Sequence, residues 1–147
     1  MKLSEGFYII GDPCYIIGDD AWDLVLKETN FFGREATKPC DRLPMDNGRY
    51  NDGIFTITDC DGEKHHISAF NTGGDGGHMG SDGFEYGVDS GTLACIPASF
   101  STKGKLGPLW SGIRCCNNYL SDEDFDCRDL GDTIQFGEIF IEKIWCD

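Results

Sequence analysis

The stretch that decides the fold is IFTITDCDGEKHHISAF, residues 54–70. Apolar and polar side chains alternate from Ile54 to Asp59, as they do in a half-buried strand. The dipeptide Asp61-Gly62 that follows is a strong signal for a two-residue hairpin turn. A return strand is then expected from about Lys64 to Phe70. The segment therefore predicts an antiparallel β-hairpin.

Further strand-like runs lie on both sides of this hairpin. Val, Ile, aromatic residues and short apolar runs bounded by turn residues indicate strands, and a Gly137-Glu138 bulge would reconcile the two apolar phases of the last run. The expected strands cover residues 7–10, 14–17, 84–88, 92–97, 110–119 and 133–145. The predicted fold is α+β, mostly antiparallel β-sheet, sandwich or barrel-like, in a single domain over residues 1–147.

Helical signals are few. Asp19 and Asp20 can cap a helix in which Trp22, Val25 and Leu26 share one face, and this main N-terminal helix is expected to end near residue 30. Ser121-Asp-Glu-Asp124 resembles a capping box and predicts a short helical turn. Residues 33–53 and 101–109 are rich in turn-forming residues and are expected to be irregular.

The chain is strongly acidic, with a formal net charge of −14 over 147 residues. Such a charge repels nucleic-acid backbones and anionic membranes, so neither is an expected direct partner. No apolar run approaches the roughly 20 residues of a membrane-spanning helix. An acidic protein can instead imitate nucleic acid and cover a basic groove on another protein.

Eight cysteines raise the question of disulfides or a metal. Met1 is followed by a charged, mixed segment rather than an apolar signal region, and Cys95 lies inside an apolar run. Reduced thiols in the cytoplasm are therefore expected, with no metal or cofactor, and whether Cys115 and Cys116 are redox-active is left open. Cys14 follows Asp12 closely, and a nearby carboxylate raises a thiol pKa, so Cys14 is interpreted as a packing residue.

The segment Asn71–Gly91 is the predicted functional surface, because eight of the 20 glycines lie in its 21 residues. Such a run suits either close approach of backbone amides to a ligand or a flexible tip. It also carries side chains that could contact a ligand. The candidate ligand-binding residues are Asp75, Gly76, His78, Ser81, Asp82, Tyr86, Asp89 and Ser90.

Chemistry in this segment would depend on His78, the candidate acid or base near neutral pH. No Lys or Arg occurs between Lys64 and Lys103. An anion there would therefore rely on backbone amides, on histidines, or on basic residues from elsewhere. His65 and His66 are adjacent on a predicted strand and point to opposite faces, so at most one is expected to join a site.

Several landmarks along the chain resemble a group of short, uncharacterised proteins encoded by bacteriophages and some bacteria. The resemblance implies a phage-type origin and a location in the cytoplasm of an infected host cell. In this chain Gly77-His78-Met79 replaces the aromatic residue that usually follows the Gly-Asp-Gly landmark. The matching landmarks are Gly6–Tyr15, the helix with Trp22, Gly74-Asp75-Gly76, Tyr86–Gly91 and Ile134–Ile141.

Three functional hypotheses follow. The first is a small phage-type binding protein that antagonises a host factor, as an anti-defence protein would, and is more consistent with a non-enzyme. It would sequester a small, nucleotide-like anionic signal or mask a basic surface of a host protein. The second is a small phosphodiesterase-like hydrolase that uses His78 and the carboxylates of the glycine-rich segment. The third is a structural or assembly protein, and a homo-oligomer is compatible with all three.

Overall fold

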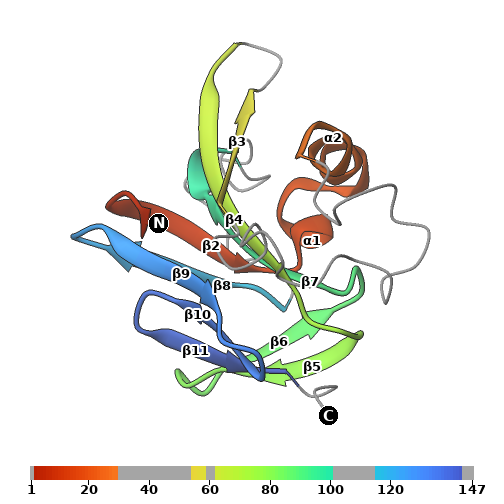
Figure 1. Ribbon diagram of the computed structural model, residues 1–147, viewed down its shortest axis with the longest axis vertical. Coiled ribbons are helices and arrows are strands. Elements are labelled where there is room, and N and C mark those ends of the chain that lie inside the picture. The colour runs from red at the N-terminus through yellow and green to blue at the C-terminus, as the bar shows by residue number, and fades with distance from the viewer. Residues whose placement is uncertain (1, 30–53, 59–61, 101–114, 144–147) are drawn as a thin grey trace.

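A computed structural model of the chain describes residues 2–29, 54–58, 62–100 and 115–143. Its centre is a five-stranded antiparallel sheet in the order β3-β4-β7-β2-β8 (Figure 1). Strand β2 pairs with both β7 and β8, and β4 pairs with both β3 and β7. The strands are β2 (Gly6–Gly11), β3 (Ile54–Thr58), β4 (Lys64–Asn71), β7 (Thr92–Pro97) and β8 (Asn117–Ser121).

A second, four-stranded sheet has the order β1-β9-β10-β11. The two-stranded hairpin β5-β6 lies beside it and is joined to β11 by an isolated bridge between Gly80 and Ile141. The bounds are β1 (Lys2–Leu3), β5 (Gly76–Met79), β6 (Glu85–Val88), β9 (Phe125–Asp129), β10 (Thr133–Phe136) and β11 (Ile139–Glu142).

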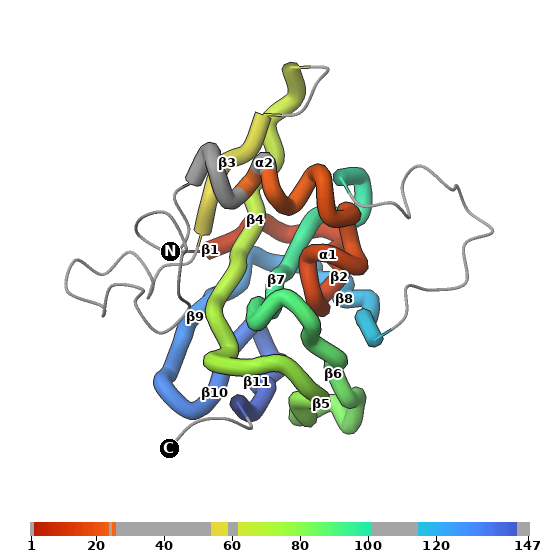
Figure 2. The backbone as a smooth tube through the Cα atoms, turned by 90° about the vertical axis from the view of Figure 1, so that its right-hand side faces the viewer, coloured from red at the N-terminus to blue at the C-terminus, as the bar shows by residue number. Residues whose placement is uncertain are grey.

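Two hydrophobic clusters occupy opposite faces of the central sheet. Adjacent residues of β2 belong to different clusters. Ile9 is in the cluster under the helices, and Ile10 is in the cluster shared with the second sheet. Period-two alternation explains this division. The helices are α1 (Pro13–Ile17) and α2 (Asp19–Thr29), and Figure 2 shows the β3–β4 hairpin projecting at one end of the molecule. None of the described helices is long and apolar enough to cross a membrane.

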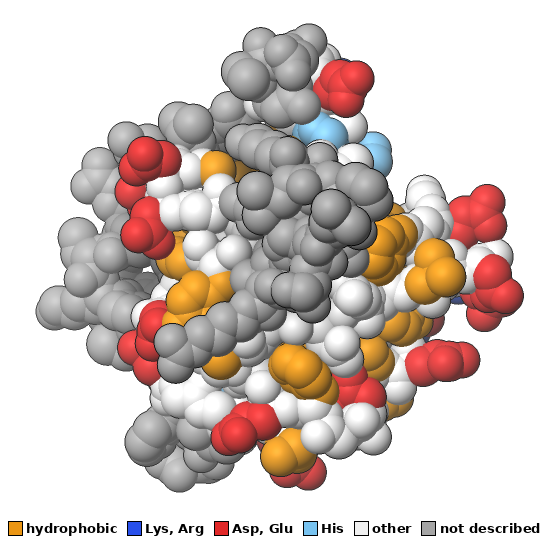
Figure 3. All heavy atoms as spheres, turned by 180° about the vertical axis from the view of Figure 1, so that it is seen from behind, with side chains coloured by type: hydrophobic (Ala, Val, Ile, Leu, Met, Phe, Trp, Pro, Cys, Tyr) orange, Lys and Arg blue, Asp and Glu red, His pale blue; other side chains and the backbone are white. Residues whose placement is uncertain are grey.

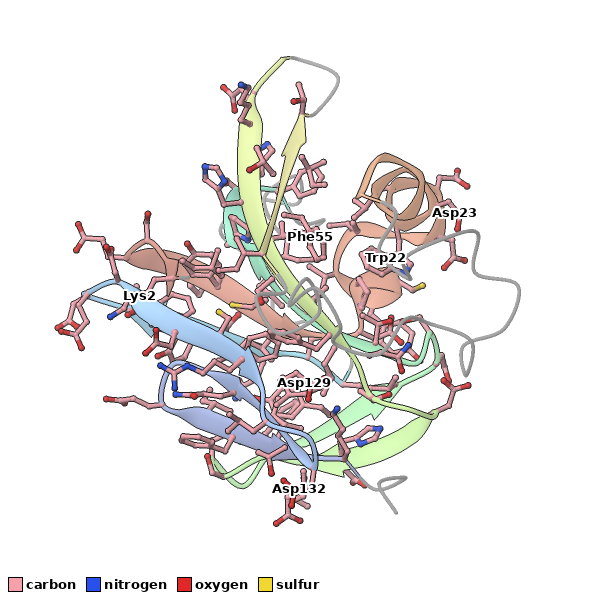
Figure 4. All side chains as sticks on the ribbon, in the orientation of Figure 1. Lys2, Trp22, Asp23, Phe55, Asp129 and Asp132 are labelled. Atoms are coloured by element: carbon pink, nitrogen blue, oxygen red, sulfur yellow. The ribbon has the colours of Figure 1, made fainter. Side chains whose placement is uncertain are left out.

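The structure confirms the α+β, mostly antiparallel architecture, and the sheets do not close into a barrel. The deciding hairpin forms as expected, with Phe55 opposite Ile67. Helix α2 begins at Asp19 and buries Trp22 and Val25, as the apolar spacing predicted. Figure 4 shows Trp22 and Phe55 on the same side of the β3–β4 hairpin, between that hairpin and α2.

The strand expected over residues 14–17 is wrong, because this segment is helix α1. Asp12 is its N-cap and its side chain accepts a hydrogen bond from the Cys14 N–H. Pro13 occupies the first turn, where its fixed φ favours a helix and its missing N–H costs nothing. Local capping therefore outweighs the strand propensity of Ile16 and Ile17, which both pack under the central sheet.

Two expectations near the C-terminus are also wrong. Ser121 ends β8 rather than starting a helical turn, and its hydroxyl donates to the Glu123 carbonyl in a tight connection to β9. Gly137 and Glu138 form a two-residue hairpin turn and not a bulge, since Phe136 pairs directly with Ile139. A turn changes the apolar phase as effectively as a bulge does, and Gly137 has the positive φ of 61° that such a turn favours.

The glycine-rich segment is more regular than expected, because it contains the β5–β6 hairpin. Several other expectations fall outside the described residues. They are the irregular segments at 33–53 and 101–109, the first part of the strand at 110–119, and the end of the strand at 133–145.

Candidate functional site

His78, the predicted acid or base, is fully buried on β5. Its Nδ1 lies 3.2 Å from the Glu142 carbonyl oxygen, and its Nε2 lies 3.3 Å from the Gly74 carbonyl oxygen. Both ring nitrogens therefore face backbone oxygens of the protein itself. In this arrangement the imidazole joins β5 to the end of β11, and it is not presented to a substrate.

Asp89 and Ser90 belong to a second group, which is organised by buried Asp12. Asp12 Oδ2 accepts from the N–H groups of Asp89 (2.6 Å) and Ser90 (2.8 Å), and Oδ1 accepts from Ser90 Oγ (2.9 Å). The Tyr15 hydroxyl donates to Asp89. These bonds tie the N-cap of α1 to the end of the glycine-rich segment. Ser90 is therefore a donor to a carboxylate that is already used in capping α1.

Asp82 and Tyr86 form a third group at the tip of the β5–β6 hairpin. The buried Tyr86 hydroxyl donates to Asp82 Oδ2 over 2.8 Å, and Asn117 Nδ2 donates to the same oxygen over 3.1 Å. Burial first, and then the bond to Asp82, raises the pKa of Tyr86 well above its usual range. Ser81 Oγ accepts from the Phe140 N–H, which fastens the tip to β11.

Six of the eight predicted ligand-binding residues are thus distributed over three separate internal hydrogen-bonded groups. Asp75 and Gly76 are exposed, and Gly76 is the first residue of β5. Ser81 also borders a groove of about 320 Å³ beside exposed Met79 and Phe140. Ligand binding by this segment stays a prediction, and the contacts described here give its residues a structural role.

A different part of the molecule holds a cavity with a basic lining. It has a volume of about 500 Å³ and lies against the β3–β4 hairpin and the start of the chain. None of the ten described residues that line it is Asp or Glu, although the chain has 26 of these. We call it the basic cavity, and its lining residues are Lys2, Ser4, Tyr8, Ile54, Thr56, Lys64, His65, His66, Pro97 and Ser99.

Strand register explains how this lining is assembled. Lys64 and His66 share one face of β4 by alternation, and Thr56 lies opposite His66 on β3. This face is the one that bears Ser68, away from the helices. The neighbouring residue His65 points to the other face, where its ring stacks on Phe100 at a centroid distance of 4.4 Å. Both histidines line the cavity, but only the His66 ring is exposed to solvent on the cavity side.

The cations of the cavity differ in their surroundings. Neither Lys2 nor Lys64 forms an ion pair with another residue in the described ranges. Lys2 pairs in register with Asp126 and also borders an acidic groove, so its charge is partly offset. Figure 4 shows Lys2 on the side of the molecule away from Trp22 and α2. Lys64 borders only the basic cavity among the cavities described, and is therefore its main cation.

One pair in the cavity could in principle support chemistry. Thr56 Oγ1 lies 2.9 Å from His66 Nδ1, within reach for a hydroxyl and a base. Across the described part of the chain no side chain holds the other ring nitrogen of His66. A cross-strand Thr–His contact is also an ordinary way to stabilise a sheet. The pair is thus an incomplete catalytic arrangement.

Carboxylates gather around a second groove, which shares Lys2 with the basic cavity. A groove of about 250 Å³ is formed where the β8–β9 connection meets the β10–β11 turn, and it is bordered by Asp122, Glu123, Asp124, Asp126 and Glu138. Figure 3 shows acidic side chains at both edges and at the bottom of the face that it draws. The groove has the charge that a basic protein surface would require, and masking of such a surface stays a prediction.

Metal and thiol chemistry have little support among the described residues. No group of three or more His, Cys, Asp or Glu side chains in these ranges is arranged to hold a metal ion. Burial, followed by the charge of Asp12, raises the pKa of Cys14 to about 12. This thiol is therefore protonated at neutral pH, in line with its interpretation as a packing residue.

Comparisons of the chain with protein-family models, with curated proteins and with solved structures found no match.

Sequence reasoning missed most of the basic cavity. His65 and His66 were considered as anion partners, but Lys2, Thr56 and Lys64 were not. Lys64-His65-His66 is a dense basic run in an acidic chain, and this was the available signal. The absence of carboxylates around it depends on strands that lie far apart in sequence, so it could be seen only in the folded chain.

Proposed function

We propose that this chain is a non-enzymatic binding protein that sequesters a small anionic ligand in the basic cavity. The observation that carries the proposal is the lining itself. Lys2, Lys64 and His66 line a space of about 500 Å³ that no carboxylate of the described residues borders, in a chain of net charge −14. Small-molecule pockets in proteins commonly have volumes of about 300–1,000 Å³.

Cations in such a place require a reason, because most of the surface is negative. A bound anion would gain charge-assisted hydrogen bonds from Lys64 and from the Thr56–His66 pair. The Tyr8 hydroxyl adds no negative charge at neutral pH, since burial raises the pKa of Tyr8 to about 12. The resemblance to phage-encoded proteins suggests the context, in which removing a small signal would antagonise a host factor.

A small hydrolase is the second candidate, and the Thr56–His66 contact is the observation that favours it. A hydrolase would convert its ligand, whereas a sequestering protein returns it unchanged. The substitution Thr56→Val removes the hydroxyl and keeps the branched shape. It should abolish turnover by a hydrolase, while a binding protein should show no turnover with or without it.

The test is a binding titration with phenyl phosphate at low salt, followed by denaturation and recovery of the ligand. Binding by the wild type with intact recovery is the expected result. Lys64→Gln should weaken binding about fivefold or more, as expected for the loss of one charge-assisted contact. Arg128→Gln makes the same change in net charge at an exposed pair with Asp126, outside the basic cavity, and should have little effect.

Each contrary outcome has a distinct meaning. Equal weakening by Lys64→Gln and Arg128→Gln would show a general charge effect and remove the cavity from the proposal. Release of phenol from phenyl phosphate would show turnover, and the hydrolase would then replace the binding protein as the proposed function. No binding of phenyl phosphate or of inorganic phosphate at millimolar concentration would overturn the proposed function.

A further inference from the structure

The basic cavity is chemically graded along the β3–β4 hairpin. Register places Ile54 opposite Ser68, Thr56 opposite His66, and Thr58 opposite Lys64. Side chains on one face of a strand repeat every two residues, which is about 7 Å. Towards the hairpin tip, the cavity side therefore changes from aliphatic Ile54 to the Thr56–His66 pair and then to the Lys64 cation.

The apolar end is extended by the neighbouring strands. Tyr8 on β2 is paired in register with Pro97 on β7, and both line the cavity together with Ile54. The Tyr8 hydroxyl is already used, since it donates to the Ser4 carbonyl over 2.8 Å. Its ring is also held edge-on against Phe125, with centroids 5.1 Å apart. Tyr8, Ile54 and Pro97 thus provide a fixed apolar floor rather than a set of polar contacts.

This gradient is more than an inorganic ion needs. An inorganic anion would use only Lys64 and the Thr56–His66 pair, and the half-buried side chains of Ile54 and Pro97 would remain in contact with water. Covering apolar surface with an aromatic ring is favourable in proportion to the area removed from water. A ligand that matches the whole cavity therefore has an anionic group at one end and a flat apolar group at the other.

We propose, resting on the proposed function, that the ligand of the basic cavity is an organic phosphate monoester with an aromatic or similarly apolar substituent. The phosphate contacts Lys64 and the Thr56–His66 pair, and the substituent lies on Tyr8, Ile54 and Pro97. Lys2, on the opposite wall, adds long-range attraction that is reduced by neighbouring Asp126. Nucleotide-like molecules belong to this chemical class.

The experiment compares three probes on the full chain by titration calorimetry: phenyl phosphate, methyl phosphate and phenol. Phenyl and methyl phosphate carry the same anionic group, so the difference between them reports the apolar floor. Phenyl phosphate should bind about tenfold more tightly than methyl phosphate, in keeping with partial burial of one ring. Phenol should bind more weakly than either phosphate.

Two substitutions separate the ends of the cavity. Ile54→Thr keeps a β-branched residue in the strand. It should weaken the binding of phenyl phosphate and leave the affinity for methyl phosphate unchanged. Lys64→Gln should weaken the binding of both phosphates by a similar factor. The comparison of phenyl phosphate with methyl phosphate needs no substitution. It therefore tests the role of the apolar floor even if Ile54→Thr does not fold.

Equal affinity for phenyl and methyl phosphate would overturn this inference and leave small-anion binding intact. Equal affinity for phenol and phenyl phosphate would show that the anion contributes nothing, which would overturn the inference and the proposed function together. Failure of all three probes to bind would have the same consequence for both.

Discussion

Asp12 is the buried carboxylate on which the glycine-rich segment depends. It is fully buried and accepts four hydrogen bonds, from the N–H groups of Cys14, Asp89 and Ser90 and from Ser90 Oγ. Donors from the start of α1 and from the connection between β6 and β7 thus satisfy a charge that would otherwise be costly to bury. The same side chain caps α1 and fixes the end of β6 relative to β7.

Asp12→Asn should therefore destabilise the protein strongly. An amide has one acceptor oxygen, and its NH₂ group would face backbone or hydroxyl donors, leaving some of them without a partner. We expect the free energy of unfolding to fall by about 3 kcal/mol, measured by urea denaturation. Asp20→Asn removes the same charge from the exposed first turn of α2 and should cost less than about 1 kcal/mol. Equal losses would contradict a special role for Asp12.

The sequence could identify Asp12 as a turn residue but not as this hydrogen-bonding centre. The local pattern Gly11-Asp12-Pro13 indicates a turn. The capping role of Asp12 depends on the next two residues, Pro13 and Cys14. The bonds to Asp89 and Ser90 join positions 77 and 78 residues apart. Nothing in a single sequence reports contacts at such a separation.

At the scale of elements, the β5–β6 hairpin is held to the second sheet by few contacts. Gly80 bridges Ile141, the Ser81 N–H donates to the Phe140 carbonyl over 2.7 Å, and His78 meets the Glu142 carbonyl. Gly80 is buried at this junction. A Cβ at this position would lie 2.8 Å from Cε2 of buried Tyr86, which has no room to move.

Gly80→Ala should consequently loosen the hairpin. We expect a loss of about 2 kcal/mol in the free energy of unfolding, as for overpacking at a buried site, together with faster amide exchange over β5 and β6. Gly77→Ala, on β5, is the matched control, since its new Cβ would approach the end of the exposed Glu85 side chain, which can swing away. If Gly77→Ala were equally harmful, loss of backbone freedom and not the Tyr86 contact would be the cause.

Elements with a strong local signal were predictable from sequence. The β3–β4 hairpin followed from alternation and a turn dipeptide, and α2 followed from its apolar spacing. Residues 14–17 were misassigned because capping by Asp12 and Pro13 outweighs the propensity of two isoleucines. Strand β6 agrees with the strand expected over residues 84–88. Its partner β5 was missed because Gly76 and Gly77 have low strand propensity, and the pairing is supported by tertiary contacts with β11.

At the scale of the whole molecule, buried thiols are found on both faces of the central sheet. Cys116 belongs to the cluster under the helices, and Cys95 and Cys127 belong to the cluster shared with the second sheet. Burial is the first cause that raises the pKa of Cys116 and of Cys127 to about 12. Each neutral thiol therefore links the stability of its cluster to the pH of the solution.

The protein should unfold at alkaline pH, in a single step that exposes these thiols. Below about pH 8.5 a thiol is neutral in both the folded and the unfolded chain, so its contribution to stability does not vary there. Between that pH and about pH 12 the unfolded chain releases thiol protons that the folded chain retains, so stability falls as pH rises. Two such thiols give a slope of about 3 kcal/mol per pH unit. Two pH units then remove about 6 kcal/mol, comparable with the stability of a typical domain.

Circular dichroism and thiolate absorbance, recorded together from pH 7 to 12, would measure this transition. The part of the thiolate absorbance that Cys127→Ala removes should appear together with the change in dichroism, well above the ordinary thiol pKa of about 8.5. Cys127→Ala should also reduce the slope of stability against pH by about 1.4 kcal/mol per unit, whatever its effect on stability at pH 7. If Cys127→Ala instead removed absorbance that rises near pH 8.5 while the dichroism spectrum is unchanged, this thiol would meet water in the folded chain, and its cluster would be looser than the buried position of Cys127 indicates.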